Sequence, residues 1–153
     1  MLEKILVCLD GSKAAEQILT YITPEARRLN SKLVLLRVVS LPELTVPISL
    51  PGVPGGPIST EGTRKQMQPR ESEAENYLKQ IAGSLQQQGY DIEYSVVPGM
   101  SGEVIVDYAI ENDITLIAIG THGHNIARRF FVGSTADYVI HHSNIPVLTI
   151  RPL

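Results

Sequence analysis

Glycine, histidine and arginine gather in residues 120–135, GTHGHNIARRFFVGST, directly after the apolar run at residues 115–119. Gly120 and Gly123 would let the backbone turn tightly and approach a ligand without a Cβ in the way. Gly133 would do the same at the entrance to the helix that follows. These positions suit a loop that wraps closely around a bound group.

The residues after the last glycine are suited to binding phosphate. A helix that starts at Ser134 and Thr135 would present free backbone N–H groups and two hydroxyls, and helix N-termini bind phosphate. Arg128 or Arg129 would add positive charge from the intervening turn. However, Gly133-Ser134 is also an ordinary helix start, and neither a P-loop nor a Gly-x-Gly-x-x-Gly pattern is present. The residues alone therefore leave a simple turn and a phosphate-binding loop both open.

Uninterrupted apolar runs of strand length alternate with helical patterns along the chain. Continuous apolar character indicates strands that are covered on both faces, as in a parallel sheet. The alternation predicts an α/β, doubly wound fold. Ligands of such sheets bind beyond the carboxyl ends of the strands, and Asp10 and Gly120 follow two of these runs. The expected strands are residues 5–9, 32–39, 92–97, 115–119 and 146–150.

Cap residues and apolar spacing predict the helices between these strands. Ser12 is expected to cap the first helix, and Pro24 to kink or divide it. Ser101 is expected to cap a later helix. The other expected helices are residues 71–88 and 134–142.

Composition indicates a single domain over residues 1–153. The net charge is −3 and basic residues are dispersed, which argues against nucleic acid as a partner. Cys8 is the only cysteine, which excludes a disulfide framework. No apolar run is long enough to span a membrane. We therefore expect a cytoplasmic protein. Five prolines and four glycines in residues 41–62 predict a flexible loop, either a lid or a partner surface or a passive insertion.

Five segments together resemble the universal stress protein family. Gly120-x2-Gly123-x9-Gly133-Ser134 looks like the nucleotide-binding signature of its ATP-binding members. The resemblance covers the chain outside residues 41–62 and implies a Rossmann-like sheet of five strands ordered 3-2-1-4-5, of the adenine nucleotide alpha hydrolase type. The matching segments are ILVCLDGS (5–12), LLRVV (35–39), IAIGTHG (117–123), GSTADYV (133–139) and IPVLTI (145–150).

The resemblance also implies roles for single residues. Asp10 would approach the nucleoside, and the Val38 backbone would hydrogen-bond the adenine edge. Gly120 and Gly123 would line the ribose and phosphates. The phosphates would be held by Gly133, Ser134 and Thr135, and the remaining binding residues would be His122, His124, Asn125 and Arg129.

The implied ligand is ATP, or AMP or ADP, with Mg²⁺ held by the nucleotide phosphates and not by protein ligands. His141 and His142 are adjacent on a helix and point about 100° apart, so they cannot both face His122. A sensor or regulatory module of the stress response is the first interpretation. A slow ATPase and a dimeric interaction module without nucleotide are the alternatives. The resemblance further implies a homodimer through residues 146–150, because that strand would lie at a sheet edge, while the downstream partner stays open.

Overall fold

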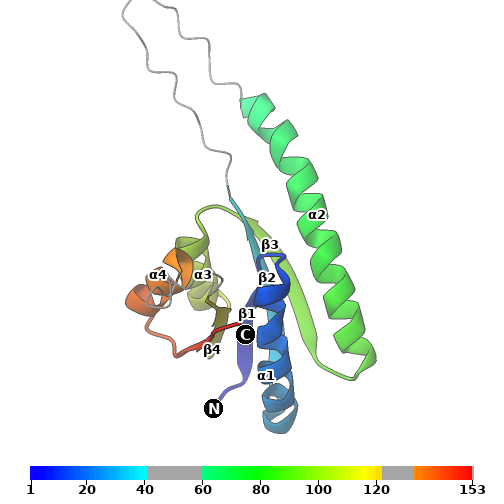
Figure 1. Ribbon diagram of the computed structural model, residues 1–153, viewed down its shortest axis with the longest axis vertical. Coiled ribbons are helices and arrows are strands. Elements are labelled where there is room, and N and C mark those ends of the chain that lie inside the picture. Colours follow the sequence, from blue (N-terminus) through cyan, green and yellow to red (C-terminus); the bar gives the residue numbers. More distant parts are fainter. Residues whose placement is uncertain (41–59, 122–132, 153) are drawn as a thin grey trace, which may run out of the picture.

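The computed structural model describes residues 1–40, 60–121 and 133–152. Strands and helices alternate along them (Figure 1). The five predicted strands and the helix at residues 134–142 are confirmed, with strand ends that move by one residue at most. The elements are β1 (Lys4–Cys8), α1 (Lys13–Leu29), β2 (Lys32–Val39), α2 (Thr60–Gln87), β3 (Ile92–Pro98), α3 (Ser101–Glu111), β4 (Leu116–Gly120), α4 (Ser134–His142) and β5 (Val147–Ile150).

The strands form one parallel sheet in the order β3-β2-β1-β4-β5, which confirms the predicted topology. β1 is central: Cys8 lies opposite Leu36 of β2 and opposite Ile119 of β4. Ile5, Leu6 and Val7 have no exposed surface. Helices cover both faces of this strand, which explains why its sequence is apolar without alternation.

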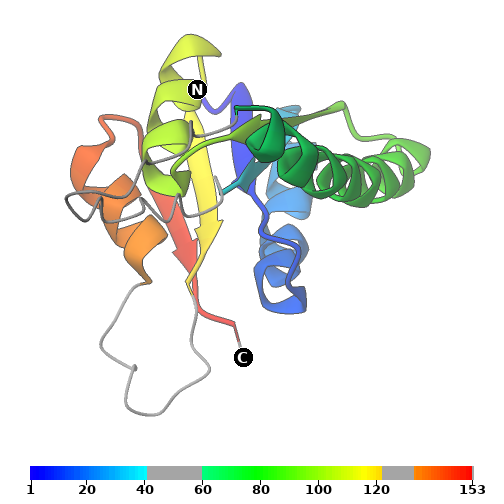
Figure 2. The ribbon, with the colours of Figure 1, turned by 90° about the horizontal axis from the view of Figure 1, so that it is seen from above.

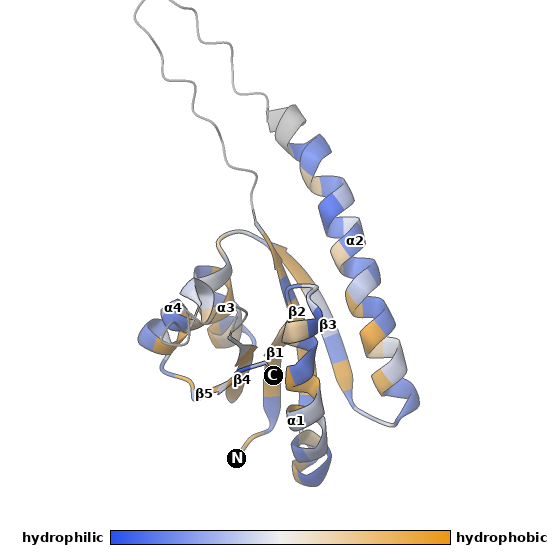
Figure 3. Cartoon of the chain, viewed as in Figure 1, coloured by the Kyte–Doolittle hydropathy of each residue, from blue (hydrophilic) through white to orange (hydrophobic). Residues whose placement is uncertain are grey.

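Two helices pack on each face of the sheet (Figure 2). On one face, side chains of α1 and α2 such as Ile18 and Leu78 meet Ile5 and Val7 of β1. On the other face, Ile105 of α3 and Val139 of α4 pack against strand side chains such as that of Leu6. Hydrophobic colour accordingly concentrates in the strands, while most of the first half of α2 is hydrophilic (Figure 3). None of the described helices combines the length and apolar character needed to cross a membrane.

α1 begins as predicted and continues further than predicted. The Ser12 hydroxyl accepts a hydrogen bond from the Ala15 backbone N–H at 3.1 Å, which confirms the cap. Pro24, however, does not divide the helix, which runs unbroken to Leu29. Proline removes one backbone donor, and buried Ile22 and Ala26 on either side of it keep the helix against the sheet.

α2 begins at Thr60, eleven residues before the predicted start at residue 71. Residues 60–62, predicted as loop, therefore belong to this helix, and the rest of that loop lies outside the described residues. The early turns have little apolar character, and Pro69 lies within them. Met67 nevertheless packs with Val39 and Ala74, which ties the first half of α2 to the end of β2.

The predicted cap at Ser101 is wrong. The residue before the helix is Met100, whose carbonyl accepts the Val104 N–H at 2.9 Å, and no side-chain cap bond is formed. Ser101 is instead the first residue of α3. Gly102 follows, and a Cβ built there would lie only 2.6 Å from Cδ1 of Tyr138 in α4. The absence of a side chain at Gly102 therefore allows α3 and α4 to approach closely.

Replacing Gly102 with alanine should weaken the contact between α3 and α4. The added Cβ would force Tyr138 or a helix to move, because both the ring and the Tyr138 Cβ lie within 3.0 Å. We expect Gly102→Ala to lower the free energy of unfolding by about 1–3 kcal/mol, the usual range for overpacking. Urea unfolding followed by circular dichroism measures the change.

Gly83→Ala is the matched control, since it also adds a methyl group to a helix. A Cβ at Gly83 meets nothing within 4 Å, so this variant should gain about 0.5–1 kcal/mol from the better helix former. A Gly102→Ala protein as stable as wild type would contradict the assigned contact.

Candidate functional site

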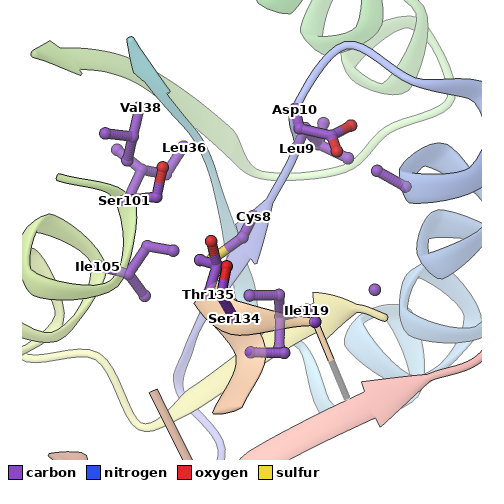
Figure 4. A pocket seen from close by; sticks show the side chains of 14 residues that line it. Cys8, Leu9, Asp10, Leu36, Val38, Ser101, Ile105, Ile119, Ser134 and Thr135 are labelled. Carbon is purple, nitrogen blue, oxygen red and sulfur yellow. The ribbon is translucent and has the colours of Figure 1, made fainter. Parts of the chain in front are cut away.

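A pocket of about 240 Å³ opens at the carboxyl ends of β1, β2 and β4, and we call it the strand-end pocket. Its lining is largely apolar and includes strand residues such as Leu36 and Ile119 and Ile105 of α3. Polar residues line it as well: Asp10 after β1, Ser101 at the start of α3, and Ser134 at the start of α4 (Figure 4). An apolar pocket with a few placed polar groups is typical of a small-molecule site.

The turn after β1 fixes the position of Asp10. Its Oδ1 accepts hydrogen bonds from the Ser12 backbone N–H at 2.8 Å and from the Ser12 hydroxyl at 2.6 Å. Gly11 adopts a φ of 89° in this turn, a conformation that favours glycine. A Cβ at Gly11 would also lie 3.1 Å from the Arg37 guanidinium. The carboxylate is therefore held at the pocket by its own turn.

The backbone of Val38 faces the gap beyond β1. The Leu9 N–H donates to the Leu36 carbonyl at 2.9 Å, which is the last ladder bond on that side of β2 among the described residues. Backbone groups of alternate residues in a strand point the same way, so the N–H and C=O of Val38 point to the side that β1 has left. They lie at the pocket as an adjacent donor and acceptor.

The first turn of α4 forms another wall of the strand-end pocket. Gly133 is the residue before the helix, and its carbonyl accepts the Asp137 N–H at 2.9 Å. A glycine has no side chain to cap the N–H groups of Ser134 and Thr135, and those groups have no intrahelical partner. Partial positive charge collects at such a helix start. This end of the pocket is suited to an anion.

The structure brings together every predicted site residue that it describes. Six of the eleven line the strand-end pocket: Asp10, Val38, Gly120, Gly133, Ser134 and Thr135. The other five lie outside the described residues: His122, Gly123, His124, Asn125 and Arg129. The same holds for Arg128.

The sequence interpretation missed the apolar lining and one hydroxyl. Cys8 is buried, and it also lines the pocket. Ser101 was assigned to a cap and lines the pocket instead. Local sequence gave no signal for Cys8 and Leu36, because their side chains reach the pocket on the sheet face that α3 and α4 cover.

His141 and His142 do not form a metal centre with other described residues. In the described part of the chain, no three His, Cys, Asp or Glu side chains lie close enough to hold an ion. Nδ1 of His141 lies 2.8 Å from the Asp137 carbonyl, and Nδ1 of His142 lies 2.8 Å from that of Tyr138. The His142 ring also stacks on Tyr138. Both histidines therefore interact within their own helix.

Comparison with known proteins decides the family. The model of the universal stress protein family matches residues 1–151. The chain belongs to the universal stress protein family. Universal stress protein Sll1388 of Synechocystis is 28% identical over 150 residues, 97% of each chain. Universal stress protein MJ0577 of Methanocaldococcus jannaschii is 28% identical over 155 residues, covering 99% of this chain and 96% of that one.

Solved structures of universal stress proteins have the same fold. The structure of MJ0577 superposes with a TM-score of 0.82 at 25% identity, covering 100% of this chain and 98% of that one. A universal stress protein in complex with cAMP superposes at 0.68, with 20% identity over 98% and 97% of the chains. A family protein of Arabidopsis thaliana with AMP bound superposes at 0.69, with 16% identity over 99% and 92%.

The Cys8 thiol should be unreactive while the protein is folded. Burial raises its pKa from 9.0 to about 12, and the thiolate is the reactive form. Alkylation by iodoacetamide near neutral pH should therefore be slow in the native protein and fast in denaturant. Since Cys8 is the only cysteine, mass spectrometry of the intact chain measures this one site.

The raised pKa of Cys8 also makes the free energy of unfolding depend on pH. An unfolded thiol ionises near 9 while the folded one stays protonated, so this group lowers the free energy of unfolding as pH rises from 9 towards 12. Native labelling as fast as that of the unfolded chain would contradict the buried position.

Proposed function

We propose that this universal stress protein binds an adenine nucleotide, with ATP as the first candidate and AMP or ADP as the others. The observation that carries the proposal is the strand-end pocket, whose lining is mostly apolar and includes Val38 of β2 and the first residues of α4. A purine needs an apolar slot with a donor and an acceptor at its edge. A phosphate needs unpaired N–H groups, as at the N-terminus of a helix.

Each part of the nucleotide has a counterpart in this pocket. The base would lie between Leu36, Ile105 and Ile119, with its edge against the N–H and C=O of Val38. The Asp10 carboxylate would accept hydrogen bonds from ribose hydroxyls. The phosphates would lie at Ser134 and at its neighbours in the first turn of α4. Mg²⁺, where it binds, would be held by these phosphates.

Relatives of the same fold support this assignment. One solved universal stress protein holds cAMP and another holds AMP. Both ligands contain adenine, ribose and one phosphate, the three groups for which this pocket has counterparts. We infer a sensor or regulatory role as the first interpretation, with a slow ATPase as the alternative.

Nucleotide released from the purified protein tests the proposal directly. The protein is denatured and the supernatant is analysed by chromatography and mass spectrometry. Released ATP would support a sensor, and released ADP or AMP after loading with ATP would indicate slow hydrolysis. Failure to bind any of the three would leave the dimeric interaction module as the function.

Calorimetric titration of Ser134→Ala tests the phosphate end. A hydroxyl that donates to a charged oxygen contributes about 1–3 kcal/mol, so ATP affinity should fall by roughly tenfold to a hundredfold. Ser84→Ala is the matched control, because Ser84 is exposed on α2 and lies outside the pocket. Equal ATP affinity in the two variants would contradict the proposed position of the phosphates.

We also propose a homodimer built on β5. β5 is an edge strand of the sheet, and its sequence carries no charge that would oppose pairing. Leu148 is 37% exposed although it is apolar. Two copies related by a two-fold axis would pair these strands antiparallel, which satisfies their free backbone groups and covers Leu148.

Light scattering coupled to size exclusion tests the dimer. Wild-type protein should elute with twice the mass of the chain, and Leu148→Lys should shift it to monomer because two lysines would meet across the axis. Ile110→Lys is the control: Ile110 is 63% exposed on α3, and the exchange adds the same charge away from β5. A monomeric wild type, or a dimer that Leu148→Lys leaves intact, would refute this interface.

A further inference from the structure

A second hollow, of about 290 Å³, continues from the strand-end pocket past the end of β2. The two share Asp10, Val38 and Ser101 in their walls. We call the second hollow the arginine pocket, because two guanidinium groups line it, whereas no described residue of the strand-end pocket is Lys or Arg. Its remaining lining is Arg37, Val39 and Ser40 from the end of β2, and Arg70 and Glu73 from α2.

The Arg37 guanidinium is held in place from two sides. Its Cζ lies 5.1 Å from the centroid of the Tyr77 ring, a cation–π distance. Tyr77 is fixed in turn, since its hydroxyl donates to Glu16 at 3.0 Å. On the other side the guanidinium packs against Gly11. A guanidinium that is already ordered loses little entropy when it binds a ligand.

The hydrogen-bond donors of Arg37 are unused within the described part of the chain. A guanidinium carries five N–H donors, and Arg37 is half-buried. Among the described residues, the guanidinium of Arg37 stacks on the Tyr77 ring. Of the nearby carboxylates, Asp10 accepts from Ser12, Glu16 accepts from Tyr77 and lies 3.2 Å from Lys13, and Glu73 lines the same hollow as Arg37. Arg37 is therefore prepared to bind an anion from outside the protein.

We propose that the arginine pocket binds a second phosphate group of the nucleotide, distant from the phosphate at the start of α4. Phosphate oxygens match the planar fork of Arg37, and Arg70 reaches the same hollow from α2. The ligand class is an adenine nucleotide that bears a further phosphate on its ribose or through a linked second nucleotide. The inference rests on the proposed function, because the nucleoside must occupy the strand-end pocket first.

The charges of the arginine pocket explain why the phosphate must be attached to a nucleotide. Asp10 and Glu73 line the same hollow as Arg37 and Arg70, so its formal charges balance. A free phosphate ion would gain little there. A phosphate that is tethered by a bound nucleoside arrives at a high effective concentration, so a modest local attraction is enough to raise affinity.

Titration with matched ligands tests the proposal. AMP, adenosine 3′,5′-bisphosphate and the linear dinucleotide pApA all carry a 5′-phosphate. AMP has no second phosphate, the bisphosphate has one on its ribose, and pApA has one that links a second nucleoside. We expect the bisphosphate, the dinucleotide or both to bind wild-type protein about tenfold more tightly than AMP, which is about the contribution of one charge-assisted hydrogen bond. A gain with the bisphosphate alone identifies a ribose phosphate, and a gain with pApA alone identifies a linked second nucleotide.

Two variants assign the gain to the arginine pocket. Arg37→Met and Arg70→Met should each reduce the gain and leave AMP affinity unchanged, and exposed Arg70 can be replaced without disturbing the core. Arg28→Met, on the far end of α1 where Arg28 pairs with Glu25, is the control for lost charge and should keep the gain.

Equal affinity of wild-type protein for all three ligands would overturn this inference and leave the proposed function intact. So would a gain that survives both Arg37→Met and Arg70→Met. Failure of AMP, ADP and ATP to bind would overturn the proposed function and the inference together.

Discussion

The parallel pairing of β1 with β2 and β4 is the constraint on which the rest of the structure depends. It brings three strand ends to one edge of the sheet, and the strands do not end at the same level. Cys8, the last residue of β1, lies opposite Leu36, whereas β2 continues to Val39. Beyond Leu36, β2 has no paired strand on its β1 side among the described residues, and the Val38 backbone faces the strand-end pocket. The strand-end pocket is thus a consequence of unequal strand lengths in a fixed register.

The same constraint explains which parts of the fold could be predicted from sequence. Residues 5–9 are apolar on both sides of the strand because helices cover both faces, and this pattern is specific for a buried parallel strand. The start of α2 left no such signal, because Met67 is the buried contact of its early turns and Pro69 argues for a loop. Ser101 resembled a cap, but Met100 takes that place. Such ends are decided by packing between distant segments, which local sequence does not reveal.

The candidate site was predictable where backbone chemistry decides and unpredictable where side-chain packing decides. Asp10 and Gly133 stand at a strand end and a helix start, positions that topology alone brings to one edge. Cys8 and Ser101 line the pocket for another reason: their side chains face the gap between the sheet and the helices α3 and α4. The arginine pocket shows the same limit, since Arg37 and Arg70 lie in separate elements and meet only because α2 packs beside the end of β2.

The contact of Gly102 with Tyr138 links the fold to the dimensions of the site. Ser101 and Ile105 line the pocket from α3, and Ser134 and Thr135 line it from α4 (Figure 4). Gly102 stands next to Ser101, and Tyr138 lies one turn after Ser134, so their close approach fixes the spacing of the two helices beside the pocket. The glycine that matters for this spacing lies outside the glycine-rich segment at residues 120–133. A contact between two helices thus sets the distance between Ser101 and Ser134 on the walls of the strand-end pocket.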